Sequence, residues 1–584
     1  MAIEITTDVL IIGTGPAGST SAALLATYGI ECLAINRYRW LAHTPRAHIT
    51  NQRTMEVLRD LGREVENEAM MHAAPQELMG ANVFCTSLAG EEIGRMESWG
   101  TAPESAAEHR RSSPCFMNDL PQTFMEPILF KTAASRGAQT RMSTEYLSHT
   151  QDTDGVTTTV RDRLSGHEFE IRSKFLVGAD GGNSKVAADA GLPFGGKMGI
   201  GGSMNIVFKA DLSKYVAHRP SVLYWVVQPG ADVGGIGMGL VRMVRPWNEW
   251  LIVWGYDINE GVPKVDNAFA TKVAHDLIGD DTIPIEIDSV STWTVNNLYA
   301  ERNTAGRVFC MGDAVHRHPP SNGLGSNTSI QDAFNLAWKL AMVLKGQAGA
   351  RLLTSYDAER SPVARQIVTR ANKSIAEFGP IFQALGLLDT KDTHQMQANM
   401  DARVENTPEA EAQRASIRDA ITAKKYEFDA HGVEMNQRYE SSAIVTDGIP
   451  EPEFTQDAEP HYQTTTWPGA RLPHVWLFDH ERKVSSLDLA GHGRFALFSG
   501  IGGEGWTDAA KTVGDELGIE IAAYTIGPRK DWQDHLGQWA AASEVRDSGI
   551  VLVRPDHHVC WRRETVATDP TGELRRVFSS ILDR

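Results

Sequence analysis

Three glycine- and aspartate-containing motifs, each directly after a short apolar run, constrain the fold of this 584-residue chain most strongly. They are Gly13-x-Gly15-x-x-Gly18, Asp180-Gly181-x-x-Ser184 and the stretch from Gly312 to Asn327. Short apolar runs that end in glycine turns are typical of buried parallel strands. Because long segments separate the motifs, we predict an α/β dinucleotide-binding domain that is assembled from distant pieces of the chain.

The first motif has a physical logic at each position. Gly13 permits a tight turn, Gly15 lets the backbone approach a pyrophosphate, and Gly18 allows the following helix to pack closely on the strand. Pro16 and Ala17 begin that helix, whose first amides are unpaired donors for a phosphate. A chance glycine cluster is the alternative, and the predicted strand before it and helix after it argue against that.

The end of the second predicted strand departs from the usual pattern of such domains. The ribose hydroxyls are usually bound there by Glu or Asp, whereas this chain has Asn36 and Arg37. Asn36 can hydrogen-bond a hydroxyl without charge assistance. Arg37 suits an adenosine phosphate, which keeps an NADP-binding Rossmann domain open as an alternative. Arg46 is a candidate partner of the pyrophosphate or ribose, the alternative being a solvent-facing arginine before a helix.

The third motif carries the most chemistry. Asp313 directly follows an apolar run, where a carboxylate suits a ribityl hydroxyl. Pro319 and Pro320 fix an extended loop, and the next turn leads into a long predicted helix. The amides of that turn suit the negative N1–C2=O edge of a reduced flavin. The candidate cofactor-binding residues beyond the first motif are therefore Gln122, Asp180, Asp313, Pro320, Gly323, Gly325, Ser326 and Asn327.

Composition excludes several classes of function. The chain is 42% hydrophobic and 22% charged, as in an ordinary globular protein of a few domains. A net charge of -18 argues against nucleic acid and anionic membranes as partners. No segment has the length of apolar residues that a bilayer span needs. Five scattered cysteines without metal-ligand spacing predict reduced thiols, no metal site and a cytoplasmic location.

Changes of pattern along the chain predict four parts. The segment from about 204 to 295 is rich in Trp, Val, Ile and Tyr, which favours a mostly antiparallel sheet. The segment from about 389 to 429 is polar and alanine-rich, which favours helices. The predicted parts are a cofactor-binding domain (1–80, 105–190 and 297–375), a substrate-binding sheet domain (81–104 and 191–296), a helical connector (376–430) and a small α/β domain (431–584).

Further segments extend the pattern over essentially the whole chain: 46–58, 119–122, 293–296, 356–362, 431–439 and 553–556. With these and the three motifs, the chain resembles the phenol hydroxylase branch of the FAD-dependent aromatic hydroxylases. Members of that branch also tend to lack the acidic residue at the position of Asn36. The resemblance implies a Rossmann-like FAD-binding domain with an inserted, mostly antiparallel substrate domain and a thioredoxin-like C-terminal domain. The chain has no CxxC, so we expect no dithiol chemistry there.

The resemblance also implies an activity. It implies non-covalently bound FAD, NADPH and O2 as co-substrates, and ortho-hydroxylation of a substituted, chlorinated phenol to a catechol through a flavin C4a-hydroperoxide. Within that chemistry, we predict His48 as the base that deprotonates the phenol, or as its relay. Arg242 is predicted to help hold flavin or reductant, and Asp119 to orient a polar group. A homodimer or homotetramer is expected.

Several alternatives stay open at this point. As a lone histidine His48 is a weak candidate, and Arg242 fits a solvated sheet face equally well. A 2-hydroxybiphenyl-type 3-monooxygenase that uses NADH, or another flavin-dependent oxidoreductase, fits the same motifs. A flavin-dependent halogenase needs a tunnel lysine and a tryptophan-rich signature that we do not find. A plain NADP-dependent dehydrogenase leaves the segment from Asp313 to Asn327 unexplained, and a non-catalytic scaffold would be colourless.

Overall fold

The computed structural model describes residues 3–230 and 238–584. Its first sheet brings together the strands that precede the three motifs, because β10 lies between β1 and β17 and pairs with both in parallel. The strand order is β16-β17-β10-β1-β2-β7, and β8 and β9 extend the sheet beyond β10. The bounds are β1 (Ile3–Ile12), β2 (Cys32–Ile35), β7 (Gln139–Arg141), β8 (Thr144–Gln151), β9 (Val156–Asp162), β10 (Glu168–Gly178), β16 (Thr304–Ala305) and β17 (Val308–Cys310).

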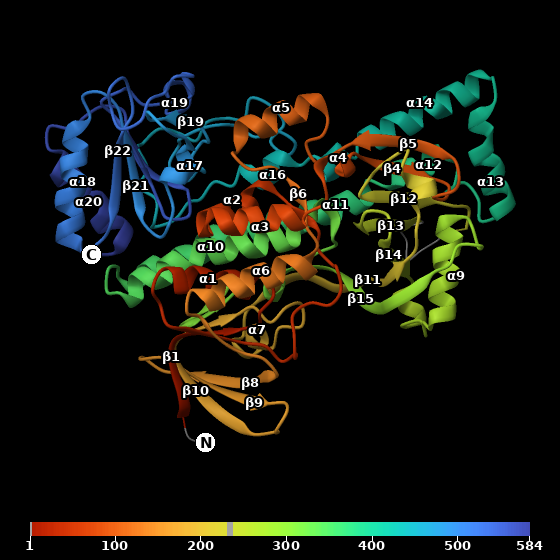
Figure 1. The fold of residues 1–584 in the computed structure, drawn as a ribbon, viewed down its shortest axis with the longest axis horizontal. Coiled ribbons are helices and arrows are strands. Elements are labelled where there is room, and N and C mark those ends of the chain that lie inside the picture. The colour runs from red at the N-terminus through yellow and green to blue at the C-terminus, as the bar shows by residue number, and fades with distance from the viewer. Residues whose placement is uncertain (1–2, 231–237) are drawn as a thin grey trace.

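A layer of helices lies against this sheet (Figure 1). Helix α1 follows the first glycine motif and packs against α10 and α6, and its Leu24 and Leu25 are fully buried. The apolar residues of α1, α2, α6 and α10 form one core with those of β1 and the C-terminal domain. The bounds are α1 (Pro16–Thr27), α2 (Gln52–Leu61), α3 (Arg63–His72), α6 (Gln122–Ser135), α7 (Lys185–Asp189) and α10 (Leu324–Leu344).

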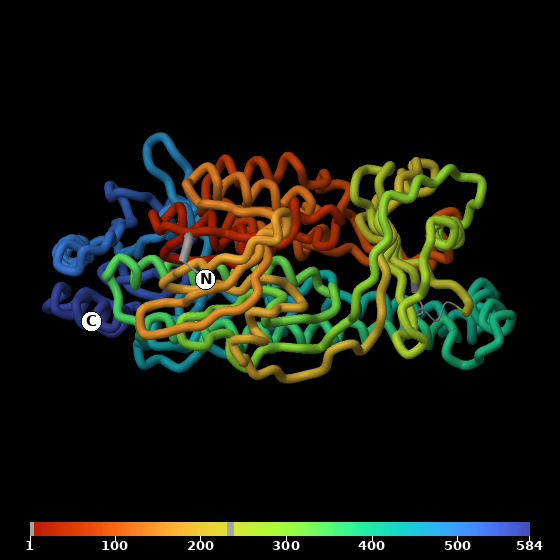
Figure 2. The backbone as a smooth tube through the Cα atoms, turned by 90° about the horizontal axis from the view of Figure 1, so that it is seen from below, coloured from red at the N-terminus to blue at the C-terminus, as the bar shows by residue number. Residues whose placement is uncertain are grey.

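The second sheet is mostly antiparallel, as predicted, with the order β18-β15-β11-β14-β13-β12-β4-β5. The β12–β4 pair is parallel. The long strands β11 and β15 run from this sheet back to the first domain (Figures 1 and 2). The bounds are β4 (Ala81–Cys85), β5 (Glu92–Glu97), β11 (Phe194–Lys209), β12 (Leu223–Val227), β13 (Met238–Arg245), β14 (Glu249–Tyr256), β15 (Glu286–Ala300) and β18 (His316–Arg317).

Helices connect the two sheet domains with the C-terminal part. After α11 the chain forms a series of short helices, of which α14 packs on β5 of the second sheet. The bounds are α4 (Gln76–Met79), α5 (Pro103–Ser112), α8 (Ser213–Val216), α9 (Asn267–Ile278), α11 (Ser355–Ala376), α12 (Gly379–Ala384), α13 (Thr393–Asp401), α14 (Pro408–Thr422), α15 (Lys425–Phe428) and α16 (His431–Met435). The residue limits predicted for the four parts stay predictions.

The C-terminal part has the strand order β22-β21-β23-β24, in which β21 and β22 are parallel and the other pairs antiparallel. This is the arrangement of a thioredoxin-like domain. All five cysteines of the chain are buried and free, so none forms a disulfide. The bounds are β19 (Trp476–Phe478), β20 (Lys483–Ser485), α17 (Ser486–Leu489), β21 (Phe495–Ser499), α18 (Glu504–Leu517), β22 (Ile521–Thr525), α19 (Gln538–Ala542), β23 (Ile550–Val553), β24 (Val559–Arg563) and α20 (Pro570–Leu582).

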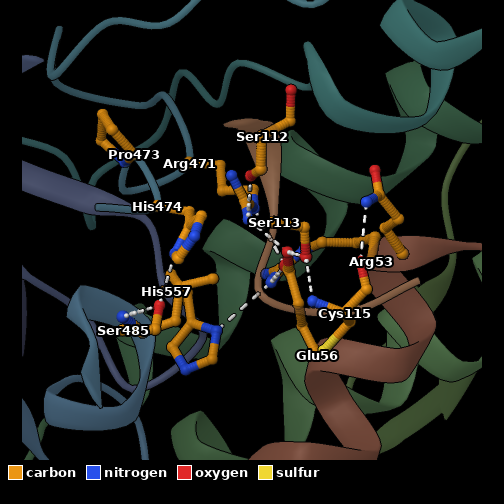
Figure 3. A network of polar contacts seen from close by, with 12 residues as sticks. Arg53, Glu56, Ser112, Ser113, Cys115, Arg471, Pro473, His474, Ser485 and His557 are labelled. Atoms are coloured by element: carbon orange, nitrogen blue, oxygen red, sulfur yellow. Dashed lines mark hydrogen bonds and ion pairs between the residues drawn. The ribbon is translucent and has the colours of Figure 1, made fainter. Parts of the chain in front are cut away.

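A buried ion-pair network joins the C-terminal part to helix α2 (Figure 3). Glu56 of α2 accepts hydrogen bonds from Arg471 and from the Ser113 hydroxyl, and it pairs with Arg53 at 3.0 Å. Burial alone would raise the pKa of Glu56, but the charges of Arg471 and Arg53 outweigh it and lower that pKa to about 2. Arg53 also donates to the carbonyl of Asp556 at 2.6 Å. The C-terminal part therefore clamps the helix that follows the segment of His48.

Candidate active site

The first glycine turn lies directly against the second motif. A Cβ on Gly13 would stand 2.2 Å from the carbonyl oxygen of Ala179, and one on Gly18 would stand 2.0 Å from that of Gly13. Both glycines are thus required by the protein's own packing. Gly15 differs, because a Cβ there would meet nothing closer than a Glu126 carboxylate oxygen at 3.8 Å. The open space at Gly15 fits a ligand, since protein packing gives no reason for a glycine there.

Helix α1 begins at this turn with Gly15 as its N-cap and Pro16 and Ala17 as its first residues. Within the described residues, no side chain caps this helix. Its first amides are therefore available to an anion, and the helix dipole favours a negative charge at the same place. The third motif reaches this site too, because a Cβ on Gly312 would meet that of Ala17 at 3.3 Å.

The two motif aspartates have different roles. Asp180 accepts hydrogen bonds from the Ser184 hydroxyl at 2.5 Å and from the amides of Lys185 and Val186 at 2.8 and 3.1 Å. Its carboxylate therefore caps helix α7, a task that the prediction of a cofactor ligand did not include. Asp313 is exposed, and its carboxylate accepts no hydrogen bond from the part of the chain described. Of the two, Asp313 has the carboxylate that is available to a ribityl hydroxyl.

Contacts within the protein place only some of the residues that were predicted to bind the adenosine end of the cofactor. The Asn36 side chain donates to the Thr14 hydroxyl at 2.6 Å and accepts from the Tyr38 amide at 3.1 Å, so it shapes the loop beside the glycine turn. Arg37 is exposed and its guanidinium stacks on the Tyr38 ring at 4.9 Å. Within the described residues, the Arg37 side chain makes no hydrogen bond or ion pair with another predicted site residue. Arg46 donates to the Thr44 hydroxyl at 3.2 Å.

Glu126 lies beside the first glycine turn, and nothing in the sequence singles it out. It is buried on α6, and its carboxylate joins the side chain of Gln122 at 2.6 Å to the amide of Ala42 at 2.6 Å. Burial raises the pKa of Glu126, whose carboxylate lies beside the open space at Gly15. No pattern in the sequence distinguishes this carboxylate from any other helical glutamate. Only its place beside the open space at Gly15 in the structure does so.

The loop from Pro319 to Asn327, here called the flavin loop, leads into α10. Gly323 is the N-cap of α10 in the left-handed conformation, and no side chain in the described ranges caps this helix either. The Asn327 side chain accepts from the Asn51 amide at 3.0 Å and donates to the Ile49 carbonyl at 2.8 Å. The flavin loop and the segment of His48 are therefore fastened together. A Cβ on Gly325 would meet only the His318 ring, at 3.7 Å.

Asp332 holds the start of the third motif, Gly312 to His316, from the inside of α10 and was missed by the sequence reasoning. Its carboxylate accepts from the Gly312 amide at 3.0 Å and lies 2.9 Å from Nε2 of His316. The buried guanidinium of Arg360 donates to its other oxygen at 2.7 Å. A polar residue inside the apolar stripe of a long helix was the available signal, but it does not say which partners it has.

The three predicted catalytic residues lie together. Strands β3 (Ile49–Thr50) and β6 (Asn118–Asp119) form a two-stranded ribbon, in which Leu120 donates its amide to the carbonyl of His48. This pairing places Nδ1 of His48 3.3 Å from Oδ1 of Asp119. Arg242 reaches the same carboxylate oxygen from β13 of the second sheet, at 2.5 Å from Nη2. The cluster therefore stands between the two sheet domains.

Burial dominates the electrostatics of this cluster, because all three side chains are less than 10% exposed. Burial and the charge of Arg242 lower the pKa of His48, although Asp119 opposes them. Burial would raise the pKa of Asp119, but Arg242 and His48 outweigh it and hold that pKa below its usual value. Asp119 is therefore ionised and His48 neutral at neutral pH.

Both ring nitrogens of His48 face acceptors. Nε2 lies 2.9 Å from the carbonyl oxygen of Pro45, and Nδ1 lies 3.3 Å from Oδ1 of Asp119. Within the described residues, Nε of Arg242 is buried without a hydrogen-bond partner. Buried polar atoms are rarely left unpaired in folded proteins, so this N–H fits a polar ligand.

Known proteins match this chain along its whole length. The chain matches the FAD binding domain family over residues 6–371 and the aromatic-ring hydroxylase C-terminal family over residues 465–584. It is 55% identical to 2,4-dichlorophenol 6-monooxygenase of Cupriavidus pinatubonensis, over 100% of this chain and 98% of that protein. It is 50% identical to phenol 2-monooxygenase of a Pseudomonas species, over 98% of this chain and 92% of that protein.

A solved structure also matches the chain. The crystal structure of the flavin-dependent monooxygenase PieE in complex with FAD and substrate matches with a TM-score of 0.95 and 42% identity, over all of both chains. Fold and comparisons together define a FAD-binding monooxygenase. The chain belongs to the FAD-dependent aromatic hydroxylases. The predicted family, fold class and cofactor are confirmed, and the dehydrogenase, halogenase and scaffold alternatives are set aside.

Within the described residues, no helix has both the length and the apolar character needed to cross a membrane, and no cluster of histidine, cysteine and acidic side chains is arranged to hold a metal ion.

Proposed function

We propose that the protein hydroxylates a chlorinated phenol at its ortho carbon to give a catechol, using NADPH and O2. The observation that carries this proposal is the full-length identity of 55% to a 2,4-dichlorophenol 6-monooxygenase, against 32% to a 4-methyl-5-nitrocatechol 5-monooxygenase. Identity of 50% to a phenol 2-monooxygenase makes unsubstituted phenol the second substrate to test.

FAD fits the open ends of two helices. We assign the pyrophosphate to the uncapped amides of α1 beside Gly15, and the pyrimidine edge to those of α10 at Gly325 and Ser326. Asp313 has the carboxylate for a ribityl hydroxyl. The remaining predicted residues complete the assignment: Gly13, Pro16, Ala17, Gly18, Asn36, Arg37, Arg46, Gln122, Asp180, Pro320, Gly323 and Asn327.

The bound flavin supplies the activated oxygen, and the protein supplies binding, orientation and proton handling. A phenol reacts as its phenolate, and a phenolic pKa is near 10 before substituents act. We assign Nδ1 of His48 as the base, in the tautomer whose Nε2–H is donated to the carbonyl oxygen of Pro45 at 2.9 Å. Asp119, 3.3 Å from Nδ1, stabilises the imidazolium that forms when the proton arrives.

Arg242 has a second task in this proposal. Its Nη2 holds Asp119, while its buried Nε is unpaired within the described residues. We assign this N–H as the donor to the phenolate oxygen, because a buried guanidinium forms strong hydrogen bonds with an anion. Burial of His48 and Asp119 also keeps water from the reacting atoms, which protects the activated oxygen from wasteful decay.

The deciding experiment is a panel of phenol, 2,4-dichlorophenol and 2-hydroxybiphenyl, offered to the purified yellow enzyme with NADPH or NADH. The product is scored as catechol formed, not as nicotinamide consumed. We expect the highest yield of catechol from 2,4-dichlorophenol with NADPH. A higher yield from 2-hydroxybiphenyl with NADH would instead assign the protein to the aryl-phenol hydroxylases.

We further propose that the enzyme is a cytoplasmic homodimer or homotetramer. The five buried free thiols support the cytoplasmic location, since a reducing compartment leaves thiols unpaired. Light scattering of the holoenzyme measures the number of subunits, and a monomeric mass would exclude the assembly.

A further inference from the structure

The flavin loop contains a residue with an unusual backbone. Asn322 has φ 64° and ψ -6°, which is a left-handed conformation that residues other than glycine rarely adopt. Its side chain is 2% exposed. A glycine would adopt this backbone without strain, so the retained side chain points to a role beyond the shape of the turn.

The side chain of Asn322 makes three hydrogen bonds. Its Nδ2 donates to the carbonyl oxygens of Tyr426 and Glu427 at 2.8 and 3.1 Å, both on α15. Its Oδ1 accepts from the hydroxyl of Ser374 on α11 at 2.8 Å. The flavin loop is therefore fastened to two helices that lie outside it in the sequence.

The partners of Ser374 fix the direction of this bond. Arg370 donates to the Ser374 oxygen from Nε at 3.2 Å and from Nη2 at 3.0 Å. The hydroxyl proton of Ser374 is therefore left for Oδ1 of Asn322. That bond sets the orientation of the Asn322 amide, so that its NH2 group points to the two carbonyls on α15.

The two helices are themselves held to each other and to the second sheet. Lys424 donates to the Ser374 carbonyl at 2.7 Å and lies 3.5 Å above the Phe378 ring, in a buried ion pair with Glu427. The Phe378 ring packs on Trp225 of β12 at 4.7 Å between centroids. Asn322 therefore ends a continuous series of contacts from the second sheet to the flavin loop.

We propose that Asn322 is a positioning residue for FAD, whose side chain fixes the flavin loop so that the first amides of α10 face the flavin. This inference rests on the proposed flavin site at Gly325 and Ser326. Loss of the side chain would leave the loop free to move away from the flavin. Weaker FAD binding and a more negative flavin midpoint potential follow, because the amides and dipole of α10 favour the negative reduced flavin.

Asn322→Gly tests the role of the side chain without changing the backbone, because glycine keeps the positive φ and removes all three hydrogen bonds. We expect its holoenzyme to release FAD on serial dilution with a Kd roughly tenfold higher, the size of about one net buried hydrogen bond. We also expect a more negative midpoint potential and less catechol formed per NADPH. Ser374→Ala removes one of the three hydrogen bonds of Asn322, together with the oxygen that accepts from Arg370. Its changes in FAD release and midpoint potential are expected to have the same sign and to be smaller.

Two controls match these variants. Arg529→Gly relieves a positive φ of 62° in the C-terminal part, and Thr369→Ala removes an exposed hydroxyl from α11. Both are expected to match the wild type in FAD release and midpoint potential. Unchanged FAD release and midpoint potential in Asn322→Gly would overturn the inference, since the residue would then serve only the turn.

Gly325→Ala separates this inference from the proposed site. Its Cβ meets only His318 at 3.7 Å, so the variant fits the protein but intrudes on the space assigned to flavin. If Gly325→Ala keeps FAD as tightly as the wild type, the proposed flavin site is wrong and the inference fails with it. If Gly325→Ala loses FAD and Asn322→Gly does not, only the role of Asn322 is wrong.

Discussion

Arg242 donates from Nη2 to Oδ1 of Asp119 at 2.5 Å, and this buried pair joins β13 of the second sheet to the β3–β6 ribbon of the FAD-binding part. A buried charge without its partner is costly, so each of the two residues requires the other. The pair also sets the charge around His48, because Arg242 lowers the pKa of His48 and Asp119 raises it.

These opposite effects predict opposite shifts of the pH profile. In the proposed role of His48 the base is the neutral ring, so we expect hydroxylation to increase as pH rises through the pKa of His48. Arg242→Gln removes a charge that lowers this pKa, and the acid limb of kcat moves to higher pH. Asp119→Asn removes a charge that raises it, and the limb moves to lower pH. Rates of catechol formation between pH 5 and 9 measure both, and shifts of the same sign would contradict this arrangement.

The three glycines of the first motif are predicted to respond differently to alanine. Gly15→Ala meets no protein atom within 3.4 Å, so the variant folds with the Tm of the wild-type apoprotein but does not retain FAD. Gly13→Ala and Gly18→Ala place a Cβ against backbone oxygens at 2.2 and 2.0 Å, so both lower the yield of folded protein. The absorbance ratio at 450 and 280 nm and the melting curve give the two readouts. A yellow Gly15→Ala enzyme with wild-type FAD content would show that the pyrophosphate lies elsewhere.

The buried ion-pair network of Glu56, Arg471 and Arg53, which joins the C-terminal part to α2, is predicted to be a main source of stability. Arg471→Met leaves Arg53 as the only charged partner of the buried Glu56 carboxylate, which costs about 3 kcal/mol of unfolding free energy. Glu56→Gln together with Arg471→Met recovers part of that loss, because the unpaired charge is gone. Urea unfolding of the holoenzyme measures both. The matched control is Arg575→Met, in an exposed pair with Glu516, for which no change is expected.

Buried histidines predict a loss of stability in mild acid. Burial, with help from Arg471, lowers the pKa of His474 to about 3, whereas the unfolded chain has a histidine pKa near 6.5. The unfolded state therefore binds more protons below pH 6.5. The contribution of the neutral ring is complete above that pH and is lost as pH falls toward 3. His474→Gln is expected to reduce the slope of unfolding free energy between pH 6 and 5 by about 1.4 kcal/mol per pH unit. An unchanged slope would mean that His474 is not neutral in the folded protein.

Local patterns predicted the framework of this fold because each motif combines a strand, a turn and a helix within a few residues. Gly13, Gly15 and Gly18 could be given roles in this way, and a strand could be placed before each motif. The role of Asp180 was only partly predictable, since its carboxylate caps α7 through Ser184 and two amides. A turn sequence does not show whether its acid is already used.

Contacts between distant segments could not be predicted from one sequence. Nothing in the sequence pairs Glu56 with Arg471 or Asn322 with Ser374, because these contacts depend on how whole domains pack. His48, Asp119 and Arg242 were each selected, but only the ribbon β3–β6 and strand β13 bring them together. The resemblance to a family gave the candidates, and the structure gives their geometry.

The most direct test of the central claim measures how fast 3,5-dichlorocatechol forms from 2,4-dichlorophenol, and how much forms per NADPH. The wild type and His48→Ala are compared across pH 5 to 9. With FAD content matched, we predict catechol formation about 100-fold slower in His48→Ala, with the acid limb of the wild-type profile absent. NADPH oxidation would continue and yield hydrogen peroxide. Equal catechol yields with the same pH profile in both proteins would contradict the assignment of His48 as the base.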